Sequence, residues 1–154
     1  MKINYTPGPL LDASRTTPTA LWNDSADLDE LRQSIAFGGV GATCNPVIGY
    51  TTIKKHPDIW EDRIRAIAEN NPTWGESQIG WQAIKDMSVE AAKLLEPIFV
   101  EHKGRNGRLS IQTDPRLHRD AKALADQAEE FSNLAPNIIV KIPCTSVGLS
   151  LIHI

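Results

Sequence analysis

The most informative segment of the sequence is Asn137-Ile138-Ile139-Val140-Lys141-Ile142-Pro143-Cys144-Thr145. Its centre is a run of β-branched apolar residues, and Pro136 and Pro143 punctuate it on either side. A short continuous apolar run predicts a strand buried on both faces, as in a parallel sheet. Lys141 is unexpected in such a strand, because an ammonium group is costly to desolvate and a lysine is rarely buried without a partner.

Three explanations account for Lys141. The side chain can reach solvent at the end of the strand, or it can pair with a carboxylate. It can also serve chemistry, because burial lowers the pKa of a lysine and frees the amine to attack a carbonyl as a Schiff-base nucleophile. The strand alone favours the two structural explanations, so the choice depends on the rest of the chain.

Strand-like and helix-like segments alternate along the chain, which predicts a parallel α/β sheet. Residues 1–17 show no periodicity, and we expect an irregular lead-in followed by one domain over residues 18–154. The expected strands are 19–23, 40–44, 108–114 and 137–142, and the expected helices are 27–37, 45–56, 57–69, 76–102, 116–134 and 145–151.

Polar residues stand at the carboxyl end of each expected strand. In parallel α/β folds the reactive groups lie where strands end and loops begin, so these positions are the candidates for a site. They are Asp24, Asn45, Gln112 with Asp114, and Lys141 with Thr145.

Four segments together resemble the first four strand ends of the transaldolase family, the class I Schiff-base enzymes built on a (β/α)8 TIM barrel. They are residues 22–28 (WNDSADL), 41–46 (GATCNP), 109–117 (LSIQTDPRL) and 140–149 (VKIPCTSVGL). The resemblance covers roughly residues 18–150. It implies a truncated barrel with only the first four βα units and a helical insertion after the second strand.

The resemblance also implies roles for individual residues. Lys141 would form the Schiff base with the ketose carbonyl, and Asp24 would be the acid/base carboxylate that handles the C4 hydroxyl proton. Asn45 would hydrogen-bond the hydroxyls of the bound dihydroxyacetone unit, and Gln112 would help to orient the catalytic water. Thr145 would touch substrate.

Each of these residues has a structural alternative. Asp24, with Ser25 beside it, is well placed to cap the helix that follows the first strand. Asn45 before a proline is a common helix entry, and Thr145 can cap the last helix. Asp114 before a proline is a turn signal, which we interpret as structural.

Gln112 is a departure from the family, many members of which have a glutamate there. A neutral amide orients water but cannot take its proton. Relatives that act as fructose 6-phosphate aldolases carry a glutamine at this place, so cleavage without transfer is an alternative.

The activity that the resemblance implies is a transaldolase of the pentose phosphate pathway. It would move a dihydroxyacetone unit from sedoheptulose 7-phosphate or fructose 6-phosphate to an aldose phosphate. A class I aldolase of fructose 6-phosphate is the second hypothesis, and a non-catalytic barrel fragment is the third. Because a half-barrel leaves strand edges open, we expect self-association, including assembly into a homo-oligomer.

Composition excludes several other classes. The chain has 154 residues and a net charge of −3, without a basic patch that would indicate nucleic-acid binding. No signal peptide or membrane-spanning segment is apparent, and Cys44 and Cys144 form no CxxC motif, so we expect a reduced, cytoplasmic setting. The four histidines share no metal-ligand spacing, and we expect no metal and no cofactor, with sugar phosphates as the partners.

Overall fold

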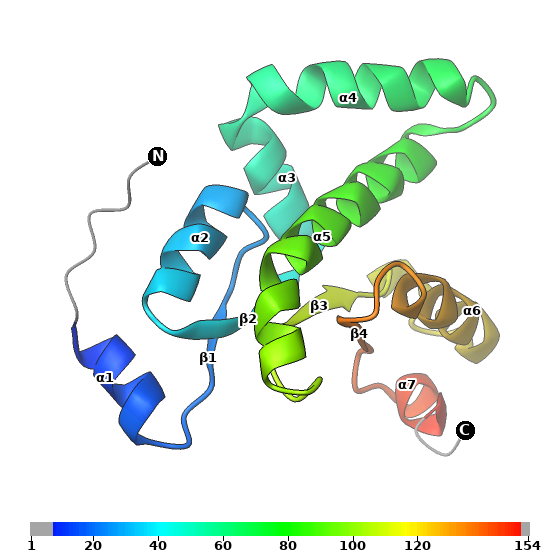
Figure 1. Ribbon diagram of the computed structural model, residues 1–154. Coiled ribbons are helices and arrows are strands. Elements are labelled where there is room, and N and C mark those ends of the chain that lie inside the picture. The colour runs from blue at the N-terminus through cyan, green and yellow to red at the C-terminus, as the bar shows by residue number, and fades with distance from the viewer. Residues whose placement is uncertain (1–7, 152–154) are drawn as a thin grey trace.

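The computed structural model describes residues 8–151, and its centre is one sheet of four parallel strands (Figure 1). The strands follow one another in chain order across the sheet, so β1 and β4 are its outer strands among these residues. They are β1 (Leu21–Asn23), β2 (Gly39–Cys44), β3 (Arg108–Gln112) and β4 (Ile138–Lys141). The predicted parallel α/β architecture is confirmed.

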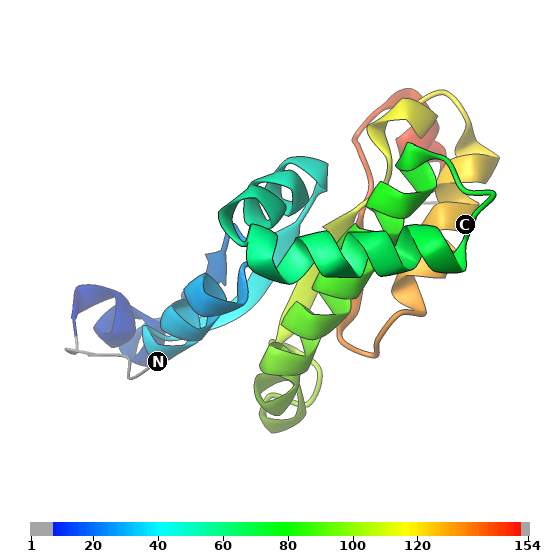
Figure 2. The same ribbon diagram turned by 90° about the horizontal axis from the view of Figure 1, so that it is seen from above.

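The helices connect successive strands. Figure 1 shows the long helix α5 running diagonally across the molecule, and Figure 2 shows α1 and α7 at opposite ends of the molecule. The helices are α1 (Pro9–Thr16), α2 (Leu28–Ala36), α3 (Pro46–Lys55), α4 (Pro57–Asn70), α5 (Glu76–Glu101), the 3-10 helix η1 (Pro115–Leu117), α6 (Ala121–Ser132) and α7 (Ser146–Ser150). None of these helices is long and apolar enough to cross a membrane.

The hydrophobic core lies on one face of the sheet, against α2, α5 and α6. Side chains alternate along a strand, so Leu109 and Ile111 of β3 point into this core and are fully buried. Met87 and Leu95 of α5 and Phe131 of α6 pack in the same cluster. Full burial of each such side chain contributes about 1.5–3 kcal/mol.

We call the opposite side of the sheet the open face. It is formed by Thr43 of β2, Ser110 and Gln112 of β3, and Ile139 and Lys141 of β4. The register is direct, because Thr43 pairs with Ser110, Ser110 with Ile139, and Gln112 with Lys141. The alternating burial of β3 confirms that the side chains of Ser110 and Gln112 do not enter the core.

The expectation that the lysine strand is buried on both faces is wrong for its carboxyl end. Ile138 is buried at 5% exposure and packs in the core, but Lys141 is exposed. The physical reason is that β4 is an outer strand whose helices cover only one of its faces. Lys141 points to the other face.

The lead-in is more ordered than expected. Residues 9–16 form α1, whereas residues 1–7 lie outside the part that the structure describes. Pro9 suits the first helical position, where its missing N–H costs nothing. Leu11 is the buried residue of this helix. A single buried apolar residue produces no hydrophobic periodicity, so the sequence pattern did not indicate a helix here.

Two helix boundaries also differ from the expectation. The helix expected over 116–134 is divided into η1 and α6, because Asp114 caps η1 and Asp120 starts a new helix by accepting from the N–H of Ala123. The cap of α2 is Asp27, whose carboxylate accepts from the N–H groups of Asp29 and Glu30. Neither Asp24 nor Ser25 has that role.

Candidate active site

The carboxyl ends of the four strands bring the predicted residues to one end of the sheet. Gln112 is the last residue of β3 and Lys141 is the last residue of β4, and the two are direct partners in the ladder. Both belong to the open face, so their side chains lie next to each other on the same surface. In the roles that the resemblance implies, Lys141 is the Schiff-base residue and Gln112 helps to orient the catalytic water.

Asp24 follows β1 and joins the same face through Thr43. The Thr43 hydroxyl donates a 2.6 Å hydrogen bond to Oδ1 of Asp24. Thr43 stands beside Ser110 in the ladder, which places the Asp24 carboxylate in a row with Ser110 and Ile139, just before Gln112 and Lys141. The helix-cap alternative for Asp24 is therefore wrong, and its side chain is exposed and available to a ligand.

Lys141 and Gln112 have free side chains among residues 8–151. No described residue hydrogen-bonds either side chain, and none forms an ion pair with Lys141. Within the described residues, Lys141 is therefore not paired with a carboxylate, which was one of the two structural explanations for it. The amine is exposed at the end of its strand.

Asn45 serves as a helix cap. Its Oδ1 accepts from the N–H groups of Val47 (2.9 Å) and Ile48 (3.0 Å) at the start of α3. These two bonds occupy the carbonyl side of the amide and fix its orientation. The Nδ2 group remains as the donor that can reach a hydroxyl or carbonyl oxygen of a ligand.

Thr145 and Asp114 also have structural roles. Thr145 caps the short helix α7, since its Oγ1 accepts from the N–H of Gly148 at 3.0 Å. The buried Asp114 accepts from the N–H of Arg116 and from the indole of Trp81, as expected of a turn residue. The ion pair with the Arg116 guanidinium lowers the pKa of Asp114 although burial opposes this.

A cluster around Asp27 was missed by the sequence analysis. Asp27 is 2% exposed, and its Oδ2 lies 2.7 Å from Nε2 of His56 and 3.0 Å from Nζ of Lys55. Lys55 also pairs with Glu30 at 2.7 Å. Burial by itself raises the pKa of Asp27, but the hydrogen bonds from the Glu30 N–H, Lys55 and His56 outweigh it and bring the pKa to about 2.

A signal for this cluster exists in the sequence. Asp27 and Glu30 have the spacing of a capping box, which would have placed the helix start correctly. The contacts with Lys55 and His56 had no comparable signal, because they join residues 28 and 29 positions apart (55 − 27 and 56 − 27).

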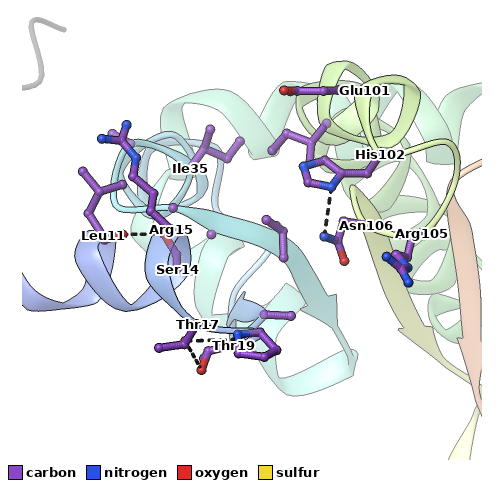
Figure 3. Close-up of a pocket in the computed structure, with 17 residues that line it drawn as sticks. Leu11, Ser14, Arg15, Thr17, Thr19, Ile35, Glu101, His102, Arg105 and Asn106 are labelled. Carbon is purple, nitrogen blue, oxygen red and sulfur yellow. Dashed lines mark hydrogen bonds between the residues drawn. The ribbon is translucent and has the colours of Figure 1, made fainter.

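Two cavities differ in their relation to the candidate residues. A small one of about 240 Å³ lies between the start of α2 and α3, and Asp24, Asp27 and Lys55 are among its lining residues. A larger one of about 820 Å³ lies at the amino ends of the strands, between α1, the start of β2 and the end of α5 (Figure 3). None of the predicted site residues lines the larger cavity.

Comparison with known proteins identifies the family. Residues 21–154 match the family model described as transaldolase/fructose-6-phosphate aldolase. The chain belongs to this family. The transaldolase/fructose-6-phosphate aldolase match begins at β1 and so includes all four strands and every predicted site residue.

Individual relatives in this family are transaldolases of bacteria. Transaldolase 1 of Streptomyces avermitilis is 34% identical over 112 residues, which are 71% of this chain and 29% of that protein. The transaldolase of Kocuria rhizophila is 31% identical over 150 residues, covering 87% of this chain and 40% of that protein. The transaldolase of Thiobacillus denitrificans is 32% identical over 138 residues, covering 84% and 38% respectively. The chain thus spans less than half the length of these relatives.

Proposed function

We propose that this chain carries the Schiff-base lysine and the acid/base carboxylate of a transaldolase. The reaction is the transfer of a dihydroxyacetone unit from a ketose phosphate, such as fructose 6-phosphate or sedoheptulose 7-phosphate, to an aldose phosphate. The observation that carries the proposal is the register of the sheet, which supports a common site for Asp24, Gln112 and Lys141.

The proposed chemistry begins at Lys141. Its Nζ adds to the C2 carbonyl of the ketose to give a carbinolamine, and loss of water then gives the imine. Asp24 takes the proton of the C4 hydroxyl as the C3–C4 bond breaks, and the electrons of that bond move into the protonated imine to form an enamine. The other fragment leaves as an aldose phosphate, which makes room for the acceptor. Attack of the enamine on the acceptor aldehyde reverses these steps, and water finally releases the product from Lys141.

The other residues support this sequence. Asn45 presents Nδ2 to a hydroxyl of the dihydroxyacetone unit, because its Oδ1 is already occupied by the start of α3. Gln112 lies beside Lys141. It orients the water that is lost when the imine forms and the water that adds to the imine when the product is released. The Thr145 oxygen caps α7, and no residue in the described part of the chain accepts its hydroxyl proton, which can therefore be donated to substrate.

We further propose that the four βα units form part of a (β/α)8 barrel in the active protein. The chain order of the strands and the confinement of α2, α5 and α6 to one face support this arrangement. In such a barrel the open face would be enclosed, which supplies the low-dielectric surroundings that an imine-forming lysine needs.

The second candidate is an aldolase that releases dihydroxyacetone, and Gln112 is the observation that favours it. Relatives that act as fructose 6-phosphate aldolases carry a glutamine at this position, where it can orient water but cannot take its proton. Both activities begin with the same Lys141 imine. They differ in what happens to the three-carbon unit, which a transferase passes to an aldose phosphate and an aldolase releases as dihydroxyacetone.

The test is a turnover assay in two proteins. One is the 154-residue chain, and the other is a chimera in which this chain replaces the matched region of the Kocuria rhizophila transaldolase. We expect no turnover from the chain alone and turnover of fructose 6-phosphate by the chimera that rises when erythrose 4-phosphate is added. Turnover that does not respond to erythrose 4-phosphate would count against the transferase and favour the aldolase.

A further inference from the structure

The loop that carries Asp24 is held at two points. The first is Asp24 itself, which accepts the hydrogen bond from Thr43 at the end of β2. The second is Asp27, three residues later, which contacts Lys55 and His56 where α3 ends and α4 begins. The partners of both anchors lie in the segment that runs from β2 to the junction between α3 and α4.

The second anchor is the stronger of the two. Asp27 is almost fully buried, and its carboxylate receives the N–H groups of Asp29 and Glu30 on one oxygen and the side chains of Lys55 and His56 on the other. Charge-assisted hydrogen bonds of this kind are about twice as strong as neutral ones. Asp24, by contrast, is exposed and makes a single side-chain hydrogen bond with a described residue.

The residues between the anchors are also fixed. The N–H of Asp27 donates to Oγ of Ser25 at 3.1 Å, and Nδ2 of Asn23 donates to the carbonyl of Ser25 at 2.9 Å. Ala26 is fully buried in the core. These contacts restrict the backbone conformation from Asn23 to Asp27 while Asp27 retains its contacts with Lys55 and His56.

We propose that Asp27, held by Lys55 and His56, is the positioning residue for Asp24. This inference rests on the proposed function, in which Asp24 is the acid/base carboxylate. Asp27 does not touch the reacting atoms; it holds the loop so that the Asp24 carboxylate stays on the open face. Asp24 and Asp27 both line the 240 Å³ cavity, and the loop residues Ser25 and Ala26 connect them along the chain.

The experiment uses NMR on the 154-residue chain with the variants Asp27→Ala and Asp27→Asn. We expect Asp27→Ala to shift the carboxyl-carbon signal of Asp24 and the side-chain signals of Thr43, and to speed the exchange of the Ser25 and Ala26 amides at least tenfold. Asp27→Asn keeps one oxygen acceptor for the cap, and its Nδ2–H can donate to Nε2 of a neutral His56, so it should restore most of the native signals.

The matched control is Asp29→Asn. Asp29 is an exposed carboxylate in the same turn, and its side chain pairs with Arg32 rather than with the α3–α4 junction. The amides of Leu109 and Ile111 report on global stability. We expect their exchange to accelerate less than that of the Ala26 amide in Asp27→Ala, and to be unchanged in Asp29→Asn. The proposal is overturned if Asp27→Ala leaves the Asp24 and Thr43 signals as they are in Asp29→Asn, or if it speeds exchange of the Leu109 amide as much as that of Ala26.

A second readout is activity in the chimera. We expect Asp27→Ala to lower kcat at least tenfold with KM within twofold of the parent, because a misplaced acid/base group affects the chemical step more than binding. An equal loss in Asp29→Asn contradicts the proposal. If the parent chimera forms no imine at Lys141, the proposed function fails, whereas the NMR comparison still decides whether Asp27 positions Asp24.

Discussion

The hydroxyl of Thr43 donates a 2.6 Å hydrogen bond to the carboxylate of Asp24, which joins the end of β2 to the loop after β1. A threonine on the open face of one strand thereby orients the candidate acid/base group of the neighbouring strand. This bond is the direct physical link between Asp24 and the row of residues that leads to Gln112 and Lys141.

The first prediction concerns this bond. Thr43→Val keeps the shape of the side chain but removes the donor, so Asp24 loses its orientation. We expect kcat of the chimera to fall about tenfold to a hundredfold, whereas the stability of the 154-residue chain changes by less than about 1 kcal/mol, because the carboxylate is exposed. Thr43→Ser, which retains a hydroxyl, should recover most of the activity. Equal activity of Thr43→Val and wild type would show that the bond has no catalytic value.

The second prediction concerns the pH dependence of stability. The pKa of Asp27 is about 2 in the folded chain and 3.8 is its ordinary value, so the folded state favours the charged form. The resulting stabilisation, about 2 kcal/mol, is present above about pH 4 and is lost as the pH falls from about 4 to 2. Urea unfolding across this range measures it.

The control for that measurement is the pair Asp27→Asn and Asp29→Asn. The first variant should be less stable near neutral pH and should show a flatter dependence at acidic pH, since the asparagine side chain has no proton to gain. The second should retain the wild-type slope. A wild-type slope in Asp27→Asn would mean that other carboxylates cause the acid sensitivity.

The third prediction concerns the two cysteines. Cys44 is 1% exposed, and burial raises the pKa of its thiol to about 11 although a hydrogen bond with Ser88 opposes this. Cys144 is exposed in the loop before α7. Because the thiolate is the reactive form, we expect iodoacetamide at about pH 8 to label Cys144 and to leave Cys44 unmodified in the folded chain. Rapid labelling that survives in Cys144→Ser would contradict the burial of Cys44.

The fold could be predicted from the sequence to a large extent, because its strands are marked by apolar runs and polar ends. The apolar and polar residues of 108–114 alternate, which predicts a strand, and the structure has β3 there with Leu109 and Ile111 buried. The exposure of Lys141 could not be predicted, since it depends on which face of β4 the helices cover.

The positions of the candidate site residues could be predicted in part. The strand ends identified Asp24, Gln112 and Lys141, because parallel strands bring their carboxyl ends together. The Asp27 cluster was not predicted, since Lys55 and His56 lie on a different helix junction and carry no local signature of their partner. The cap of α2 was misplaced for a related reason: Asp24, Ser25 and Asp27 all have side chains suited to that role.

The fourth prediction concerns Gln112 in the chimera. Gln112→Glu introduces a group that can take a proton from the water beside Lys141, so we expect a changed acidic limb in the pH–rate profile and a larger response to erythrose 4-phosphate. Gln112→Met, which has no hydrogen-bonding amide, is the matched control and should lower turnover. An identical profile in Gln112→Glu would remove Gln112 from the mechanism.

The most direct test of the role of Lys141 is borohydride trapping followed by peptide mapping. The chain and the chimera are incubated with fructose 6-phosphate and reduced, and the modified lysine is located by mass spectrometry, with Lys141→Met as the control. We predict one adduct, on Lys141, that disappears in Lys141→Met even though other exposed lysines such as Lys93 and Lys103 remain. An adduct on another lysine, or the absence of any adduct from the chimera, would contradict the assignment of Lys141 as the Schiff-base residue.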